Sequence, residues 1–297
     1  YPIHKVKNSS FRNINRELLK KFDIEDINDC KNLVAACSSC NKRKSKKTSG
    51  RRRLLQWGIL AVALAVFIFS GIQLLNISGE YEEADKEYQE LEQLAPLPQE
   101  EEAGPEDRQV DFAALAQKNS EIVGWIYIPD SKVDYPMVKG TDNSYYVSHT
   151  FEKKANGAGA IFLDWKNKGD FSDRNTVIYG HHMKNGSMFA ALVEYKDPDY
   201  FNAHRTIYLY TPQGVYTATV FSAYVDVATG PQTTISFQDD AAFLSFVETM
   251  RNQSITKTDT PIGAEDRIIT LSTCTYEYDD ARFIVQAVLH PVKTTGE

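Results

Sequence analysis

The chain has few cysteines, four in 297 residues, and three of them lie together near the start. Cys30, Cys37 and Cys40 precede a long stretch without cysteine, and Cys274 stands alone in the rest of the chain. A single cysteine excludes an internal disulfide in the large C-terminal part. Cys274 is therefore a small core residue, an intermolecular partner or a reactive thiol.

Positive charge is scarce outside the beginning of the chain. Residues 1–53 contain fifteen Lys and Arg against five Asp and Glu, whereas the remainder has a net charge of −17. An acidic body of this size disfavours nucleic acid as its partner, because phosphate contacts need Lys and Arg. A basic head and an acidic body on either side of an apolar stretch indicate two compartments.

No charged residue occurs between Leu54 and Gly79. About twenty apolar helical residues span a bilayer core, so residues 54–78 predict a transmembrane helix. A cleaved signal peptide is disfavoured because the run is long and no small-residue cleavage site follows it. Lys and Arg precede the run while Glu and Asp follow it, which predicts a cytoplasmic segment 1–53 and an extracellular remainder.

An acidic segment follows the apolar run. Apolar residues recur at steps of three and four over 80–95, which predicts a short amphipathic helix. We expect either a stalk or weak dimerising coil, or a solvated helix with one apolar stripe. Residues 96–109 have the composition of a disordered linker, so 79–110 is expected to be an acidic helical stalk and linker. The stripe consists of Tyr81, Ala84, Tyr88, Leu91 and Ala95.

Alternating strands dominate after Asp111, which we expect to cap a short helix. The alternation predicts eight strands, and residues 239–252 predict a helix with one apolar face. Closing about eight strands into a barrel removes exposed edges, so 111–297 is expected to be a mainly β domain, a closed barrel with peripheral helices. The expected strands are 124–129, 134–138, 159–165, 176–181, 206–211, 215–227, 267–273 and 282–289.

Three side chains at predicted strand ends suit acyl-transfer chemistry. Cys274 follows one strand, His181 ends another, and Arg282 begins the strand after Cys274. A thiolate can attack a carbonyl, a histidine can protonate the leaving amine, and a guanidinium can hold the oxyanion. Spacing alone leaves open that Cys274 is a core residue and that the pair is coincidental.

Two segments carry a family resemblance. TLSTCTYEYDDARFIVQAVL (270–289) resembles the C-terminal signature of the sortases, and NTVIYGHHMKNGSMFAAL (175–192) resembles their histidine segment. The resemblance extends over about residues 111–290. The residues of both segments, together with the helix expected before the TLSTC strand, are similar to those of class B sortases.

This resemblance implies a role for each matching residue. Cys274 would be the nucleophile, His181 its acid/base partner and Arg282 the oxyanion and substrate-positioning group. Ser272 and Asn143 match positions that line the substrate groove. The family uses no cofactor and has a barrel of about eight strands. Its members are anchored in a Gram-positive-type membrane and join the sorting-signal peptide of a surface protein to a cell-wall or pilin amine.

Several nearby residues have alternative roles. Tyr224 lines the groove or is a packed strand aromatic. We expect His182 to face away from His181, because strand neighbours point in opposite directions. Asp164, Asp279 or Asp280 could orient His181 as a third member of a triad. Arg282 could instead form a surface ion pair with Asp279 or Asp280.

The basic head carries a separate resemblance. DCKNLVAACSSCNKRKSKKTSG (29–50) resembles the tail of an HNH-type nuclease. Cys37 and Cys40 are half of a tetrahedral zinc site, but a second pair is missing, and Cys30 and His4 are poorly spaced substitutes. We expect a remnant joined by fusion rather than a working nuclease. The alternative is a polybasic tail that touches anionic lipid.

Two rival functions remain open for the main domain. A papain-like or wall-hydrolysing cysteine peptidase would also use Cys and His, but there the Cys usually comes first, whereas His181 precedes Cys274 here. A non-catalytic surface binding barrel would leave Cys274 inert. DNA binding or nuclease activity could reside in the head alone.

Overall fold

The computed structural model describes residues 31–98, 103–275 and 277–292. The chain divides into two compact units, Tyr1–Leu74 and Leu75–Glu297. Of the basic head, residues 1–30 lie outside the described residues, and these include His4 and Cys30. Cys37 and Cys40 lie on helix α2 (Lys31–Glu92).

Helix α2 contains the predicted transmembrane run. No proline occurs between Lys31 and Glu92, so nothing in the sequence interrupts the backbone hydrogen bonds of the helix. Its part from Leu54 onward is long and apolar enough to cross a membrane, and the large apolar side chains from Leu54 to Leu75 are exposed. An exposed apolar helix of this length is expected where lipid rather than protein surrounds it.

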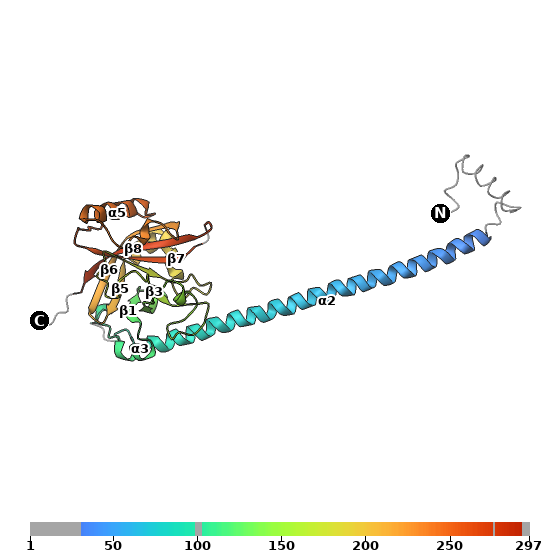
Figure 1. Ribbon diagram of the computed structural model, residues 1–297, viewed down its shortest axis with the longest axis horizontal. Helices are drawn as coiled ribbons and strands as arrows, with labels where there is room; N and C mark the ends of the chain where they lie inside the picture. Colours follow the sequence, from blue (N-terminus) through green and yellow to red (C-terminus); the bar gives the residue numbers. More distant parts are fainter. Residues whose placement is uncertain (1–30, 99–102, 276, 293–297) are drawn as a thin grey trace. The chain divides into compact units, whose positions relative to one another are not determined.

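The second unit is built around a closed, mixed β-barrel of eight strands, and the sequence predicted a closed barrel of about this size (Figure 1). The strand order around the barrel is β1-β2-β3-β4-β7-β8-β6-β5. Figure 1 shows α5 on one side of this barrel, where its buried face packs against residues of β6, β7 and β8, and α3 on the opposite side. The strands are β1 (Ile122–Tyr127), β2 (Asp134–Val138), β3 (Ile161–Leu163), β4 (Asn175–Tyr179), β5 (Thr206–Thr211), β6 (Gly214–Val227), β7 (Arg267–Cys274) and β8 (Ala281–Pro291).

Short helices connect the strands. Asp111 caps α3 by accepting a hydrogen bond from the Ala114 amide, as expected. Asp239 caps α5 in the same way, and one face of α5 is buried. The α-helices of the barrel unit after α2 are α3 (Phe112–Lys118), α4 (Pro198–Ala203) and α5 (Asp240–Gln253); the 3-10 helices are η2 (Pro105–Asp107), η3 (Tyr145–Val147), η4 (Ala190–Lys196) and η5 (Pro231–Thr233).

Two strands are shorter than predicted. β3 begins only at Ile161, because Gly159 has a φ of +60° and breaks the extended run. β4 ends at Tyr179, so His181 and His182 lie just beyond the strand. The argument that they point to opposite faces as strand neighbours therefore does not apply.

The acidic segment 79–110 differs from the expected stalk and linker. Its apolar stripe forms part of the main core of the barrel unit, where Leu91 and Ala95 are fully buried. The helical period was predicted correctly, but the sequence did not reveal that the barrel itself covers the stripe. The compact unit accordingly begins at Leu75 rather than at 111.

The end of the expected linker is also structured. The Arg108 side chain is fully buried and forms a bidentate ion pair with Asp134 of β2, with its Nη1 2.7 Å from Asp134 Oδ1. Its Nε donates to the Ala95 carbonyl at 2.6 Å. The polar composition of residues 96–109 predicts that Arg108 is solvated, but protein surrounds the Arg108 side chain on all sides.

Candidate active site

The barrel places Cys274 at the open end of β7. This strand is paired with β4 on one side and β8 on the other, so its interior residues are buried, and Cys274 is its last and half-exposed residue. A thiol at this position is held by the sheet and can still be reached by a substrate.

Arg282 lies directly opposite Cys274. A short turn joins β7 to β8, closed by hydrogen bonds from the Thr275 amide to the Ala281 carbonyl and from the Ala281 amide to Tyr278. The antiparallel register then pairs Cys274 with Arg282. Arg282 Nη1 donates to the Ala281 carbonyl at 3.0 Å. Among the described residues its side chain forms no ion pair, so the bridge to Asp279 or Asp280 is not observed.

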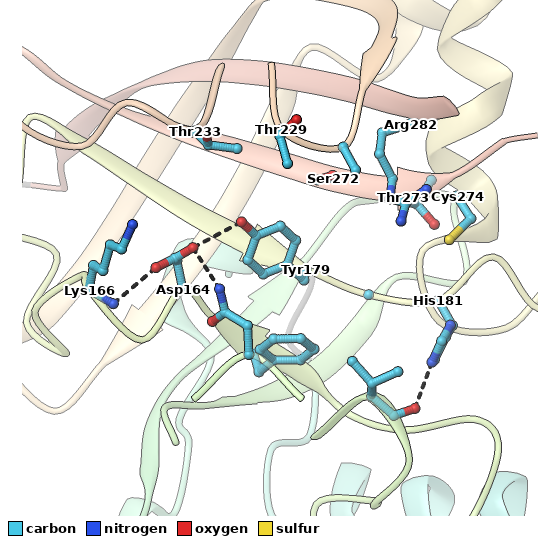
Figure 2. A pocket seen from close by; sticks show the side chains of 15 residues that line it. Asp164, Lys166, Tyr179, His181, Thr229, Thr233, Ser272, Thr273, Cys274 and Arg282 are labelled. Atoms are coloured by element: carbon cyan, nitrogen blue, oxygen red, sulfur yellow. Dashed lines mark hydrogen bonds between the residues drawn. The ribbon is translucent and has the colours of Figure 1, made fainter. Parts of the chain in front are cut away.

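His181 reaches the same place from β4. Parallel pairing with β7 sets Tyr179 beside Ser272, and the Gly180 amide donates to the Ser272 carbonyl at 3.2 Å. His181 Nε2 lies 2.7 Å from the Val147 carbonyl oxygen. Figure 2 shows the other ring nitrogen turned toward the Cys274 sulfur.

The contact between Cys274 and His181 shifts both groups in the direction that acyl transfer needs. The hydrogen bond from His181 lowers the pKa of the Cys274 thiol, and the positive charge of Arg282 lowers it further, while partial burial opposes them. The same hydrogen bond raises the pKa of His181, with help from the Val147 carbonyl. Both shifts favour a thiolate beside an imidazolium.

A groove of about 550 Å³ runs past these three side chains (Figure 2). This volume is within the usual range for ligand pockets, about 300–1,000 Å³. Two of the three predicted groove residues, Ser272 and Asn143, line it. The lining residues are Asn143, Val147, Phe162, Asp164, Lys166, Tyr179, Gly180, His181, Ala228, Thr229, Thr233, Ser272, Thr273, Cys274 and Arg282.

Tyr224 lies elsewhere, which corrects its assignment to the groove. It is buried in a second core cluster with residues of α5, and its hydroxyl donates to Met250 Sδ at 2.8 Å. Tyr224 is therefore a packed strand aromatic, the second of the two roles that the sequence left open for it. Alternating residues of β6 point to opposite sides, and the sequence alone did not show which side faces the groove.

The three candidate carboxylates do not orient His181 in the described structure, since its Nε2 meets a backbone carbonyl instead. Asp164 has other partners: its Oδ2 accepts from Asn143 Nδ2 at 2.9 Å and from the Tyr179 hydroxyl at 3.0 Å. This network fixes Asn143 in the wall of the groove.

His182 is close to the site but contacts backbone. Its Nδ1 lies 3.0 Å from the carbonyl oxygen of Cys274. This contact holds the ring against the end of β7. The sequence argument expected His182 to face away from His181, whereas the structure places its ring against the backbone of Cys274.

Sequence reasoning missed the groove residues supplied by loops. Val147, Thr229 and Thr233 lie between strands, where no pattern of alternation marks them, and only closure of the barrel brings them to β7. The Asp164–Tyr179 contact joins the residue just after β3 to the last residue of β4, and the two residue types alone do not predict it.

No cluster of three or more potential metal ligands occurs among the described residues. The side chains of Cys37 and Cys40 lie outside that description, so the zinc interpretation remains a sequence-based expectation. The arrangement at Cys274 brings together a thiol, an imidazole and a guanidinium, the kinds of group that cysteine acyl transfer uses.

Comparison with known proteins agrees with this geometry. The family model described as a sortase domain matches residues 126–290. Sortase B of Listeria monocytogenes is 36% identical over 177 residues, which is 59% of this chain and 72% of that protein. These comparisons give no support to the nuclease resemblance of the head.

Solved structures show the same likeness. The crystal structure of sortase B from B. anthracis in complex with AAEK1 matches with a TM-score of 0.63 and 36% identity, covering 72% of this chain and 99% of that one. A Staphylococcus aureus sortase B-substrate complex matches with a TM-score of 0.58 and 31% identity, covering 61% of this chain and 85% of that one. The chain belongs to the sortase family and is a cysteine transpeptidase similar to sortase B.

Proposed function

We propose that this enzyme cleaves the sorting-signal peptide of surface proteins and transfers the acyl part to a primary amine of a cell-wall precursor or pilin. The observation that carries the proposal is the convergence of Cys274, His181 and Arg282 on one groove, where the His181 contact shifts the thiol and imidazole pKa values in opposite directions. The similar S. aureus structure is a complex with substrate.

In the first half-reaction the Cys274 thiolate attacks the carbonyl carbon of the scissile bond. Arg282 stabilises the negative charge that develops on the carbonyl oxygen. The C–N bond then breaks, and the imidazolium of His181 gives its proton to the departing amine. The products are a thioester on Cys274, a neutral His181 and a free peptide amine.

In the second half-reaction an acceptor amine attacks the thioester carbonyl. Neutral His181 takes a proton from the attacking nitrogen, and the C–S bond breaks to restore the thiolate. The Asn143–Asp164–Tyr179 network and Ser272 form the wall along which the peptide lies in this proposal.

A peptide library tests the proposed reaction. The full chain in detergent is incubated with five-residue peptides and an excess of triglycine, and mass spectrometry locates the cleaved bond and the new amide. We expect one peptide family to be joined to triglycine and a thioester to be trapped on Cys274. A chain that alkylates normally at Cys274 but neither cleaves nor joins any peptide would contradict the proposal.

We also propose that residues 54–78 anchor the enzyme with its N-terminus in the cytoplasm. The basic residues before the run and the acidic residues after it support this orientation. Protease added to intact spheroplasts should remove the chain beyond about residue 80. A protected C-terminal domain would reverse the orientation.

A further inference from the structure

The buried stripe of α2 does more than fill the core, because two neighbouring polar residues of this helix hold the loop between η3 and β3. Glu87 accepts hydrogen bonds from the Thr150 hydroxyl and from the Glu152 amide, each at 3.0 Å. The Tyr88 hydroxyl accepts from the Phe151 amide at 3.3 Å. Both side chains are more than nine-tenths buried.

Tyr88 also makes the bond that leads toward the active site. Its hydroxyl donates to the Gly159 carbonyl at 2.7 Å. Burial raises the pKa of Tyr88 well above its ordinary value, so the hydroxyl keeps the proton that it donates. The ring packs edge-on against Tyr135, with centroids 5.2 Å apart.

Gly159 lies directly against the histidine and its acceptor. A Cβ atom added at this glycine would come within 2.9 Å of the Val147 carbonyl oxygen and 3.1 Å of His181 Cδ2. The Gly159 peptide therefore packs against both ends of the hydrogen bond between Val147 and His181. A shift of this peptide would move the carbonyl, the ring or both.

We propose that Tyr88 is a positioning residue for His181, acting through the Gly159 peptide and the Val147 carbonyl. The proposal rests on the proposed role of His181 as partner of Cys274. It gives the part of α2 beyond the membrane run an indirect part in catalysis, because the position of the active-site histidine then depends on a hydroxyl of that helix.

The chemistry predicts which property of Tyr88 matters. Tyr88→Phe keeps the ring and its packing but leaves the Gly159 carbonyl and the Phe151 amide without their partner. The loop should then settle in a different position, and misplacement of a catalytic group by about 1 Å can cost up to about 10²-fold in rate.

Reactivity of Cys274 measures the effect without any knowledge of the natural peptide. The full chain in detergent is alkylated over a range of pH, and mass spectrometry follows the peptide that contains Cys274 separately from Cys30, Cys37 and Cys40. Cys274 and Arg282 are the groups whose charges act on His181. A displaced imidazole should raise the thiol pKa toward its ordinary value, so alkylation in Tyr88→Phe at neutral pH should slow about tenfold, as one pKa unit implies.

Tyr210→Phe is the matched control. Tyr210 is also buried, and its hydroxyl donates to the Pro105 carbonyl at 2.6 Å, on a strand whose barrel neighbours are β1 and β6. The control should melt at a lower temperature without any change in the pH profile of Cys274. Equal profiles for Tyr88→Phe, Tyr210→Phe and the wild type would overturn the proposal.

His181→Ala separates this proposal from the one on which it rests. If His181→Ala alkylates like the wild type, the pairing of His181 with Cys274 is wrong and the proposal falls with it. If His181→Ala shifts the profile but Tyr88→Phe does not, only the positioning role is wrong. Should Tyr88→Phe fail to fold, Glu87→Gln loosens the same loop; a raised thiol pKa supports the proposal, and a wild-type profile overturns it.

Discussion

Two arginines, Arg108 near the base of the barrel and Arg282 at the groove, show how differently the same side chain is used within one unit. Arg108 has no exposed side-chain surface, a carboxylate partner in Asp134 and the rings of Trp125 and Tyr210 within 5.5 Å of its guanidinium. Arg282 donates to the backbone carbonyl of Ala281 and faces an open groove.

The two arginines differ in whether their guanidinium donors are already used by partners within the protein. Burial raises the pKa of Asp134 even though Arg108 and Trp125 donate to it, so the pair stabilises little beyond the cost of burying it. Arg282 keeps donors available for a substrate oxygen. An arginine that is paired with a buried carboxylate belongs to the fold. An arginine that keeps donors available beside a nucleophile can stabilise the charge that develops in a reaction.

The largest expected effect concerns Cys274, which lies beside Arg282 in the groove. Cys274→Ala should abolish peptide cleavage because the hydroxyl groups that remain in the groove are far weaker nucleophiles than a thiolate. The free energy of unfolding should change by about 1 kcal/mol or less, since Cys274 is half-exposed and loses little buried area. Peptide turnover and thermal melting measure the two quantities. Residual turnover, or a variant that does not fold, would return Cys274 to a structural role.

The two histidines should differ next. His181→Ala should reduce kcat/KM by about 10²–10⁴-fold, the range of general acid–base catalysis. His182→Ala removes a contact to the Cys274 carbonyl and should cost far less. The measurement is kcat/KM for both purified variants at a temperature well below their melting temperatures. The reverse order would show that the roles were exchanged.

The arginines themselves should respond in opposite ways. Arg282→Ala should lower the rate by about 10²–10³-fold with little loss of stability, and Arg282→Lys should recover only part because it lacks the planar fork. Arg108→Met should destabilise the fold by about 3–5 kcal/mol, because Asp134 is left buried and unpaired.

Denaturant unfolding and the turnover of the folded enzyme separate these two effects. Folded Arg108→Met should retain wild-type kcat. Normal turnover in Arg282→Ala would remove this arginine from the mechanism, and wild-type stability in Arg108→Met would remove the distinction between the two sites.

The smallest effect concerns pH. His181 lowers the pKa of Cys274 most strongly and Arg282 adds to it, so Arg282→Ala should move the acid side of the Cys274 alkylation profile to higher pH, by less than His181→Ala does. The alkaline limb of kcat/KM should lie above the ordinary histidine range, because the pKa of His181 is raised. Arg108→Met should leave both limbs in place. An acid limb at the ordinary cysteine pKa would contradict the pairing.

Much of the site could be predicted because its main residues are close in sequence or belong to strong patterns. Cys274 and Arg282 flank one hairpin turn, so their proximity follows from antiparallel pairing. His181 follows a strand whose place beside β7 needs the whole topology, and the prediction relied there on the family resemblance.

The sequence by itself determined the local elements of this protein. Alternation and helical period revealed the strands, the apolar run and the stripe on 80–95, because these depend on backbone geometry and side-chain polarity alone. Tertiary structure decided what each surface meets. The barrel, not solvent or a second chain, covers the stripe; Arg108 is buried rather than solvated; and Tyr224 faces the core. These outcomes depend on contacts between distant segments, which composition and period do not encode.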